Sequence, residues 1–473
     1  MSNNIVHIIK SLSYTFVANL VSLIVSTVVI LVVPKILGVS SYGYWQLYVF
    51  YASYVGFLHL GWNDGIYLRY GGSEYNELNK ETFFSQYSML NILQILIAFV
   101  IFIFVLYYVE DSNRRFVYIS ISVNLVITNS RYFLIYVLQA TNRIRNYAVL
   151  TLTDRLVYVI VLIVLLAFGI KDYRYLIYAD IFGRIISLIY GSIKCSEIVW
   201  RKENKFILTF LEAFENIKVG SKLMFSNIAN MMIIGMVRFG IEKNWDISTF
   251  GKVSLVLSIS NAAMLFVNTV GIVFFPILKR TDQNKLGNLY LVMRSILMTL
   301  LLGLLIFSVP LELVLNKWLP NYADSLIYIP LIFPIIAYEG KMVILINTYL
   351  KVLRKENMML KINLISLFIS FISTVSIIYF THNIEILVTS ILFLLIIRSS
   401  IAEIYLLNIL DIVLIKDLLL EFVLVGIFVL LNLLFVSLSS FLLYFVCYLL
   451  YLLIKRSEII SSFVQMKRLI NTK

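Results

Sequence analysis

Long apolar runs dominate this chain, and only short segments containing charged residues, Asn, Gly or Pro separate them. A helix needs about 20 apolar residues to cross the roughly 30 Å hydrocarbon core of a bilayer. The runs reach that length, so each is predicted to be a transmembrane helix. The predicted helices span about residues 11–33, 43–68, 83–108, 116–139, 146–169, 174–198, 219–241, 249–277, 288–315, 324–350, 358–380 and 384–408, with two more inside 419–454.

The composition narrows the class of protein further. Apolar residues make up 61% of the chain and charged residues only 14%, whereas soluble domains have about 45–50% apolar and about 25% charged residues. These values exclude a soluble enzyme, a disordered chain and a secreted disulfide scaffold. We therefore predict an all-α polytopic membrane protein with about 14 transmembrane helices and no resident metal or cofactor.

An internal repeat suggests two pseudo-symmetric lobes of six helices, followed by two C-terminal helices. Ser41-Tyr42-Gly43 precedes the second predicted helix, and Thr249-Phe250-Gly251 precedes the eighth. Parallel repeats of this kind are common in transporters. The predicted domains are an N-terminal lobe at 1–200, a cytoplasmic amphipathic linker at 201–218, a C-terminal lobe at 219–410, and the last two helices with a cytoplasmic tail at 411–473.

The positive charge of the chain predicts its orientation. The formal net charge is +13. If the N-terminus is cytoplasmic, the inner segments hold roughly three times as many Lys and Arg residues as the outer loops, in agreement with the positive-inside rule. With an even number of helices, both termini lie in the cytoplasm. No basic stretch is long enough to form a nucleic-acid-binding domain, so we expect no nucleic-acid partner.

Several charged residues lie deep within the predicted helices. A charge near mid-membrane costs about 2.5–3.5 kcal/mol or more and usually faces an internal cavity. The basic excess predicts a cationic cavity for a phosphate-bearing substrate, because the Arg fork binds two phosphate oxygens at once. The predicted cavity cations are Arg131, Arg155, Arg184, Arg238, Lys341 and Arg398. The candidate carboxylates for coupling to an ion gradient are Asp64, Asp154, Asp180 and Glu339.

Structural roles for some of these residues stay open. Asp180 and Arg184 are four residues apart and can form a pair within one helix. Arg294 lies near the cytoplasmic end of its helix and can extend to the surface. Asp64 can mark a break in its helix rather than an ion site. Pro330 and Pro334, which precede Glu339-Gly340-Lys341, predict a kink that is either a hinge or a static bend.

The sequence resembles one transporter family in three stretches, Pro34 to Gly38, Ser41 to Trp45 and Leu60 to Gly72. They are similar to the Wzx-type polysaccharide flippases of the multidrug, oligosaccharidyl-lipid and polysaccharide exporter superfamily. The resemblance implies alternating-access translocation of an undecaprenyl-diphosphate-linked oligosaccharide across the bacterial plasma membrane, for O-antigen, lipopolysaccharide or capsule synthesis. It also implies a cationic central cavity, coupling to a proton or sodium gradient, and partnership with the polymerase and chain-length regulator of that pathway.

The resemblance also bears on the C-terminal helices. Lipid II flippases have two extra helices that form a groove for the lipid tail, and the stretch 419–454 is expected to serve similarly, with no charge inside the membrane. Lipid II flippases also carry an Arg–Asp pair in their first helix. The predicted first helix here has no charged residue, so a peptidoglycan precursor is not the implied substrate.

Two alternatives remain. A multidrug antiporter of the same fold would favour a more acidic cavity for cationic drugs. A membrane oligosaccharide polymerase or ligase would need a catalytic face outside the membrane, and no predicted outer loop exceeds about a dozen residues. We therefore expect a transporter rather than an enzyme.

Overall fold

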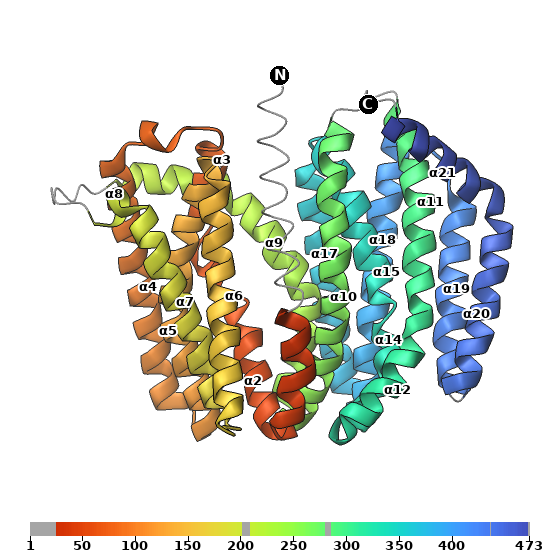
Figure 1. Cartoon of the computed structure of the whole chain (residues 1–473), viewed down its shortest axis with the longest axis horizontal. Helices are drawn as coiled ribbons and strands as arrows, with labels where there is room; N and C mark the ends of the chain where they lie inside the picture. The colour runs from red at the N-terminus through yellow and green to blue at the C-terminus, as the bar shows by residue number, and fades with distance from the viewer. Residues whose placement is uncertain (1–24, 201–208, 280–284, 436, 472–473) are drawn as a thin grey trace. The chain divides into compact units, whose positions relative to one another are not determined.

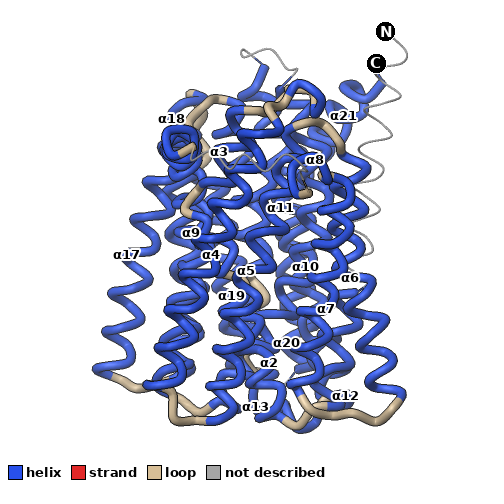
Figure 2. Tube along the Cα trace, turned by 90° about the vertical axis from the view of Figure 1, so that its left-hand side faces the viewer, coloured by secondary structure: helices blue, strands red, loops and turns tan. Residues whose placement is uncertain are grey.

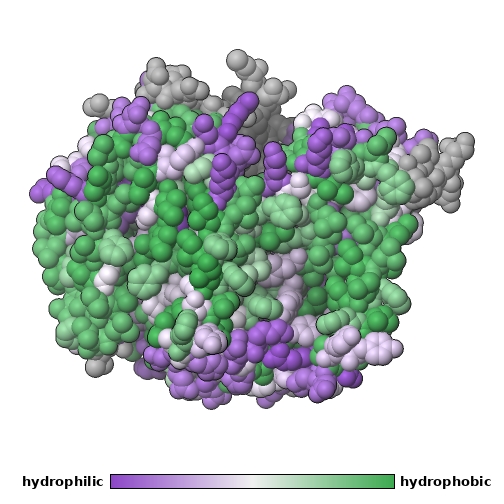
Figure 3. Space-filling view, turned by 180° about the vertical axis from the view of Figure 1, so that it is seen from behind, coloured by the Kyte–Doolittle hydropathy of each residue, from purple (hydrophilic) through white to green (hydrophobic). Residues whose placement is uncertain are grey.

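The computed structural model describes residues 25–200, 209–279, 285–435 and 437–471, and within these ranges every regular element is a helix. Within each of the two units of the chain, the long helices run up and down, with their connecting loops at the two ends (Figures 1 and 2). On the face shown in Figure 3, hydrophobic residues cover the middle and hydrophilic residues gather at the upper and lower margins. This distribution is the one that a bilayer requires, so the predicted fold class is confirmed.

Two compact units divide the chain. The first comprises residues 1–228 and 246–251, and the second comprises 229–245 and 252–473. Helices of the first unit are α2 (Val39–Ala52), η1 (Val55–His59), α3 (Trp62–Arg69), η2 (Tyr75–Glu77), α4 (Lys80–Tyr108), α5 (Ser112–Ala140), α6 (Ile144–Ala167), α7 (Tyr173–Lys194) and α8 (Ser196–Val199). The units share α9 (Phe210–Asn244) and α10 (Ile247–Lys279).

The second unit continues from α10 to the C-terminus. Its helices are α11 (Leu286–Leu304), η4 (Leu305–Phe307), α12 (Ser308–Trp318), η5 (Pro320–Tyr322), α13 (Ala323–Leu326), α14 (Ile329–Ile332), α15 (Ile335–Gly340), the π-helix η6 (Lys341–Ile346), α16 (Asn347–Val352), α17 (Glu356–Phe380), α18 (Ile384–Leu410), α19 (Ile415–Leu434), α20 (Ser437–Ile454) and α21 (Arg456–Asn471).

Most predicted transmembrane helices are present. Ten helices in the described part are long and apolar enough to span a membrane, and the bent pair formed by α20 and α21 makes an eleventh. Together they match eleven of the fourteen predicted ranges. Of the other three, the range 249–277 lies within α10, and 11–33 lies mostly outside the described residues. The third, 43–68, is the one that the structure contradicts.

A break interrupts the second predicted helix, so the prediction of one continuous helix over 43–68 is wrong. The helix α2 ends at Ala52, the short 3₁₀-helix η1 follows, and the α-helical backbone resumes at Trp62, the first residue of α3. Leu60 and Gly61 adopt φ values of 58° and 85°, in the left-handed region that ends a helix. A strongly apolar run hides such a break, because hydropathy does not reveal where a helix must turn.

Buried amides make this break possible within the membrane. The Asn129 side chain donates to the carbonyl of Val55 at 2.9 Å, and Gln94 donates to the carbonyl of Leu58 at 3.1 Å. Asn129 also donates to the Gln94 side chain at 2.7 Å. Irregular backbone is tolerated at membrane depth only when its polar groups are satisfied within the protein. The two amides on α4 and α5 therefore stabilise the break between α2 and α3.

Glycines let the broken segment pack closely against other backbone in the first unit. A Cβ placed on Gly65 would lie 1.9 Å from the carbonyl oxygen of Asn216, and one on Gly220 would lie 2.1 Å from that of Gly61. Small residues allow this approach between helices in membranes. The repeat glycines also meet, because a Cβ on Gly251 would lie 2.7 Å from the Cα of Gly43.

The segment predicted as an amphipathic linker at 201–218 is described only from residue 209. There it is the start of α9, which continues without a break to Asn244. Its apolar residues Phe210, Leu211 and Phe214 are exposed. The division into four predicted domains stays a prediction.

The close contact between α3 and α9 gives a stability prediction. Gly65→Ala should lower the unfolding temperature of the purified protein, because overpacking against backbone costs about 1–3 kcal/mol or more. Gly426→Ala in α19 is the matched control, since no atom lies within 4 Å of its added Cβ. Thermal unfolding in detergent, followed by size-exclusion chromatography, compares the two. Equal unfolding temperatures for both variants would contradict the described contact.

Candidate functional site

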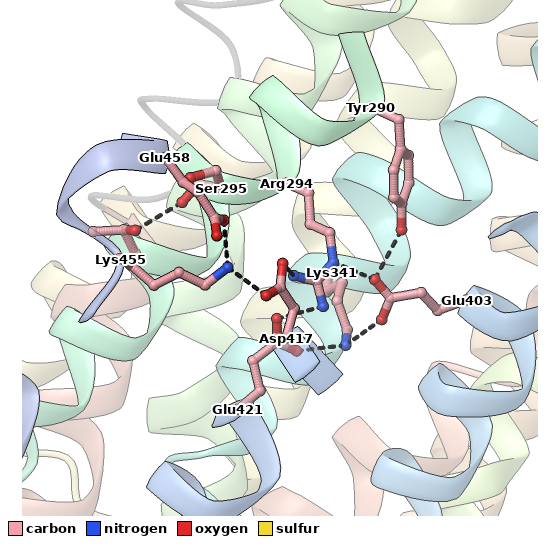
Figure 4. Close-up of polar contacts among 10 residues, drawn as sticks. Tyr290, Arg294, Ser295, Lys341, Glu403, Asp417, Glu421, Lys455 and Glu458 are labelled. Carbon is pink, nitrogen blue, oxygen red and sulfur yellow. Dashed lines mark hydrogen bonds and ion pairs between the residues drawn. The ribbon is translucent and has the colours of Figure 1, made fainter. Parts of the chain in front are cut away.

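Four buried charges from four helices form an ionic cluster in the second unit (Figure 4). Glu403 on α18 accepts from Arg294 Nε of α11 and from Lys341 Nζ of η6, each at 2.6 Å. Glu421 on α19 lies 2.6 Å from Arg294 Nη2 and 3.0 Å from Lys341 Nζ. Each of these side chains is at most 4% exposed. Two acids and two bases thus alternate and neutralise one another inside the helix bundle.

Further charges extend this cluster to the end of the bundle. Asp417 of α19 lies 3.4 Å from Arg294 Nη1. Lys455, between α20 and α21, pairs with Asp417 and with Glu458. Figure 4 shows a continuous series of contacts from Glu458, whose side chain is 57% exposed, to Glu403, which is fully buried. The last two helices are therefore joined to the interior of the unit by ion pairs as well as by apolar packing.

The path of the chain before Lys341 explains how its ammonium reaches the cluster. Pro330 and Pro334 stand at the starts of the short helices α14 and α15, where their missing N–H groups cost least. The π-helix η6 follows directly and begins at Lys341. The predicted kink is therefore present, as a series of short helices. Single-turn π segments occur frequently at functional sites.

Arg398, which is buried, and Glu339, which is 14% exposed, form a separate ion pair in the same unit. Arg398 Nη1 donates to Glu339 Oε1 at 2.6 Å, and its Nε donates to Asn363 Oδ1 at 3.2 Å. Both residues belong to the predicted site, and no acid lies four residues from Arg398 in its own helix. The partner comes from α15 instead, which a pattern within one helix cannot show.

Residues of the predicted site form two ion pairs in the first unit. Arg131 of α5 lies 3.0 Å from Asp154 of α6, and both are nearly buried. Arg184 and Asp180 pair within α7 at 2.9 Å, as the alternative interpretation of these residues expected. The hydroxyl of Tyr48 on α2 donates to Asp180 at 2.7 Å. These pairs connect four helices of the first unit.

Asp64 lies at the helix break. Its carboxylate is 3.6 Å from His59 Nε2 and accepts from the Tyr136 hydroxyl at 3.4 Å. Gly61 N in turn donates to His59 Nδ1 at 3.0 Å. The structure thus places Asp64 where the alternative interpretation put it, beside the turn between η1 and α3. A role for Asp64 in ion coupling stays a prediction.

The two remaining predicted cations lie on α6 and α9. Arg155 on α6 is exposed and makes no ion pair within the described ranges. Arg238 of α9 is half-buried and donates to Ser254 Oγ at 3.0 Å. At least four of the six predicted cavity cations have a carboxylate partner. Those four are Arg131, Arg184, Lys341 and Arg398.

Two sequence-based expectations for the second unit are wrong. Glu421 lies inside the C-terminal helix pair, which was expected to carry no charge within the membrane, and it is 3% exposed. Arg294 does not extend to the surface but is 3% exposed and binds three carboxylates. The spacing of Asp417 and Glu421, four residues apart on one helix face, is the pattern that could have predicted an inward-facing acidic pair.

Comparisons with known proteins show which solved structures share this fold. No protein-family model and no curated protein matches this sequence. Among solved structures, the lipid II flippase MurJ in an inward closed conformation has a TM-score of 0.63 and 14% identity, covering 95% of this chain and 99% of the flippase. An inward-facing multidrug resistance MATE transporter of the MOP superfamily has a TM-score of 0.59 and 10% identity, covering 83% of this chain and 98% of the transporter.

A MATE protein in complex with MaD5 is also similar, with a TM-score of 0.53 and 11% identity over 85% of this chain and 96% of that protein. All three likenesses are in structure at low sequence identity. The chain therefore shares the fold of these three proteins.

The ionic cluster gives a second stability prediction. Lys341→Met should destabilise the protein strongly, by about 3–5 kcal/mol, because it leaves Glu403 and Glu421 with too little compensating charge. Lys218→Met is the control, because the Lys218–Glu215 pair is mostly exposed and such pairs contribute about 0–1 kcal/mol. Unfolding by titration with sodium dodecyl sulfate measures both variants. The same midpoint for Lys341→Met and the unmodified chain would show that the cluster does not stabilise the fold.

Proposed function

We propose that this protein is a flippase that moves a lipid-linked oligosaccharide across the bacterial plasma membrane, with both termini in the cytoplasm. The observation that carries the proposal is the extent of the structural likeness to a lipid II flippase. That likeness covers 95% of this chain, against 83% and 85% for the two MATE proteins. The difference between 95% and 83% of 473 residues is about 57 residues. The C-terminal segment 411–473 has about this length.

The C-terminal helices support a lipid-linked substrate. Both α19 and α20 carry large apolar side chains that are exposed, although they contribute buried residues to the second unit as well. A polyprenyl tail is apolar and needs such a surface within the membrane. The exposed side chains include Phe422, Leu430, Leu433, Leu442, Leu449 and Leu453. We propose that the tail lies along this surface while the headgroup crosses.

The exposed cation Arg155 is the best candidate for the headgroup. Arg155 makes no ion pair within the described part of the chain. An Arg held without a carboxylate keeps its charge available for a diphosphate. The paired cations Arg131, Arg184 and Arg398 can contribute only if their pairs open. Such opening is one way in which a proton or sodium ion at Asp154, Asp180 or Glu339 would be coupled to transport, while an ion at Asp64 would instead act beside His59.

The proposed substrate is an undecaprenyl-diphosphate-linked repeat unit for O-antigen, lipopolysaccharide or capsule synthesis. In that pathway the polymerase and the chain-length regulator would use the translocated unit. A second candidate, a multidrug transporter, is favoured by the likeness to the two MATE structures. It predicts loss of drug resistance rather than loss of surface glycan when the gene is removed.

Deletion of the gene distinguishes these functions. In the native strain, the deletion should make lipid-linked repeat units accumulate in the inner leaflet and should remove the surface glycan. Their leaflet is measured by the access of an added glycan-modifying enzyme to inverted and right-side-out vesicles. Normal surface glycan together with new drug sensitivity would favour the multidrug transporter instead.

A pair of Arg variants tests the headgroup contact. Arg155→Ala should reduce export at least tenfold without changing the unfolding temperature, because Arg155 is exposed and makes no ion pair in the described part of the chain. Arg398→Ala is the comparison. It leaves the Glu339 carboxylate without its paired cation, so it should lower stability as well as export. Arg155→Lys keeps the charge and should restore part of the export. Full export by Arg155→Ala would show that Arg155 is not part of the substrate site.

A further inference from the structure

A second group of cations lies at one end of the first unit, away from the ion pairs described above. The group is formed by Lys80 at the start of α4, Arg143 and Arg145 at the start of α6, and Lys194 at the end of α7. This is the end where α3 and α8 are labelled in Figure 1. Its basic loops predict that it faces the cytoplasm.

Two tyrosines organise these cations. Tyr75 is buried, and both Lys80 Nζ and the Arg143 guanidinium carbon lie 3.5 Å from the centre of its ring. Lys194 Nζ lies 5.7 Å from the ring centre of Tyr190, and Arg145 interacts electrostatically with the same tyrosine. Aromatic rings attract cations without neutralising them.

Backbone carbonyls complete the positioning. Lys80 donates to the carbonyl of Tyr75, and Arg143 donates to the carbonyl of Lys194 at 3.4 Å. The bond from Arg143 to Lys194 also links the cations around Tyr75 to the cations around Tyr190. Each of these acceptors is neutral, so the cations are held in place while their charges stay available.

Carboxylates are scarce around this cluster. Among the described residues, Lys80 is the only one of the four cations within 4.0 Å of a carboxylate, namely Glu197 at 3.7 Å. The Glu197 side chain is 62% exposed, and Glu74 and Glu77 beside Tyr75 are exposed, with each carboxylate accepting from the backbone N–H of the other residue. This differs from the interior of both units, where buried cations have close carboxylate partners.

We propose that Lys80, Arg143, Arg145 and Lys194 form a binding site for the phosphate headgroup of an anionic membrane lipid at the cytoplasmic surface. Basic pockets between membrane helices on that side bind lipids with phosphate headgroups. Four cations in two adjoining pairs suit a headgroup with two phosphates, such as that of cardiolipin. The site is separate from the proposed transport path and does not depend on the proposed function.

Native mass spectrometry of the full chain in detergent tests the site. The probe is cardiolipin added at defined ratios, with phosphatidylcholine as the neutral comparison. Arg145→Gln with Lys194→Gln should weaken cardiolipin binding roughly thirtyfold, because each surface cation contributes severalfold to the binding of anionic lipid. Both side chains are exposed, so this double variant should elute normally from a size-exclusion column.

Lys351→Gln with Lys355→Gln is the matched control. These two exposed cations lie at the end of α16 and directly before α17, at a turn of the second unit that is also predicted to be cytoplasmic, and their loss removes the same charge. The control should change cardiolipin binding by less than about twofold, within the context dependence of single charges. Equal weakening by both double variants would show a general surface-charge effect and overturn the site. Unchanged binding in both would overturn it too, as would displacement of cardiolipin by millimolar inorganic pyrophosphate.

Discussion

The absence of water from the bilayer core is the constraint on which this structure depends. Every buried charge or free backbone group must find its partner inside the protein, because lipid offers none. The second unit meets this requirement with alternating acids and bases from α11, η6, α18 and α19. The first unit meets it with the Arg131–Asp154 pair and with amides that bind the carbonyls of the broken helix.

This constraint also explains what the sequence could predict. Apolar runs of about 20 residues are sufficient to locate helices, because the bilayer imposes one length on all of them. They could not locate the break between α2 and α3, whose stabilising amides are 36 and 74 residues away along the chain. Pro330 and Pro334 did reveal the interrupted tenth helix, because their effect on the backbone is local.

The candidate site was predicted less completely than the fold. Hydropathy shows that a charge such as Arg398 lies within the membrane, but its partner Glu339 comes from another helix, 59 residues away. Only the packing of the helices distinguishes a paired cation from one that is available to a substrate. Arg155 and Arg131 look alike in the sequence, since neither has an acid four residues away in its helix, yet one is exposed and the other is bound to Asp154.

The meeting of the two repeat glycines has an evolutionary consequence. Gly43 and Gly251 occupy corresponding positions in the repeat predicted from the sequence, and a Cβ on Gly251 would lie 2.7 Å from the Cα of Gly43. A Cβ on Gly43 would instead lie 2.2 Å from the carbonyl oxygen of Ile247, four residues before Gly251. Neither position can acquire a larger residue while these contacts persist. In any set of relatives that keeps this packing, we therefore expect both positions to remain glycine.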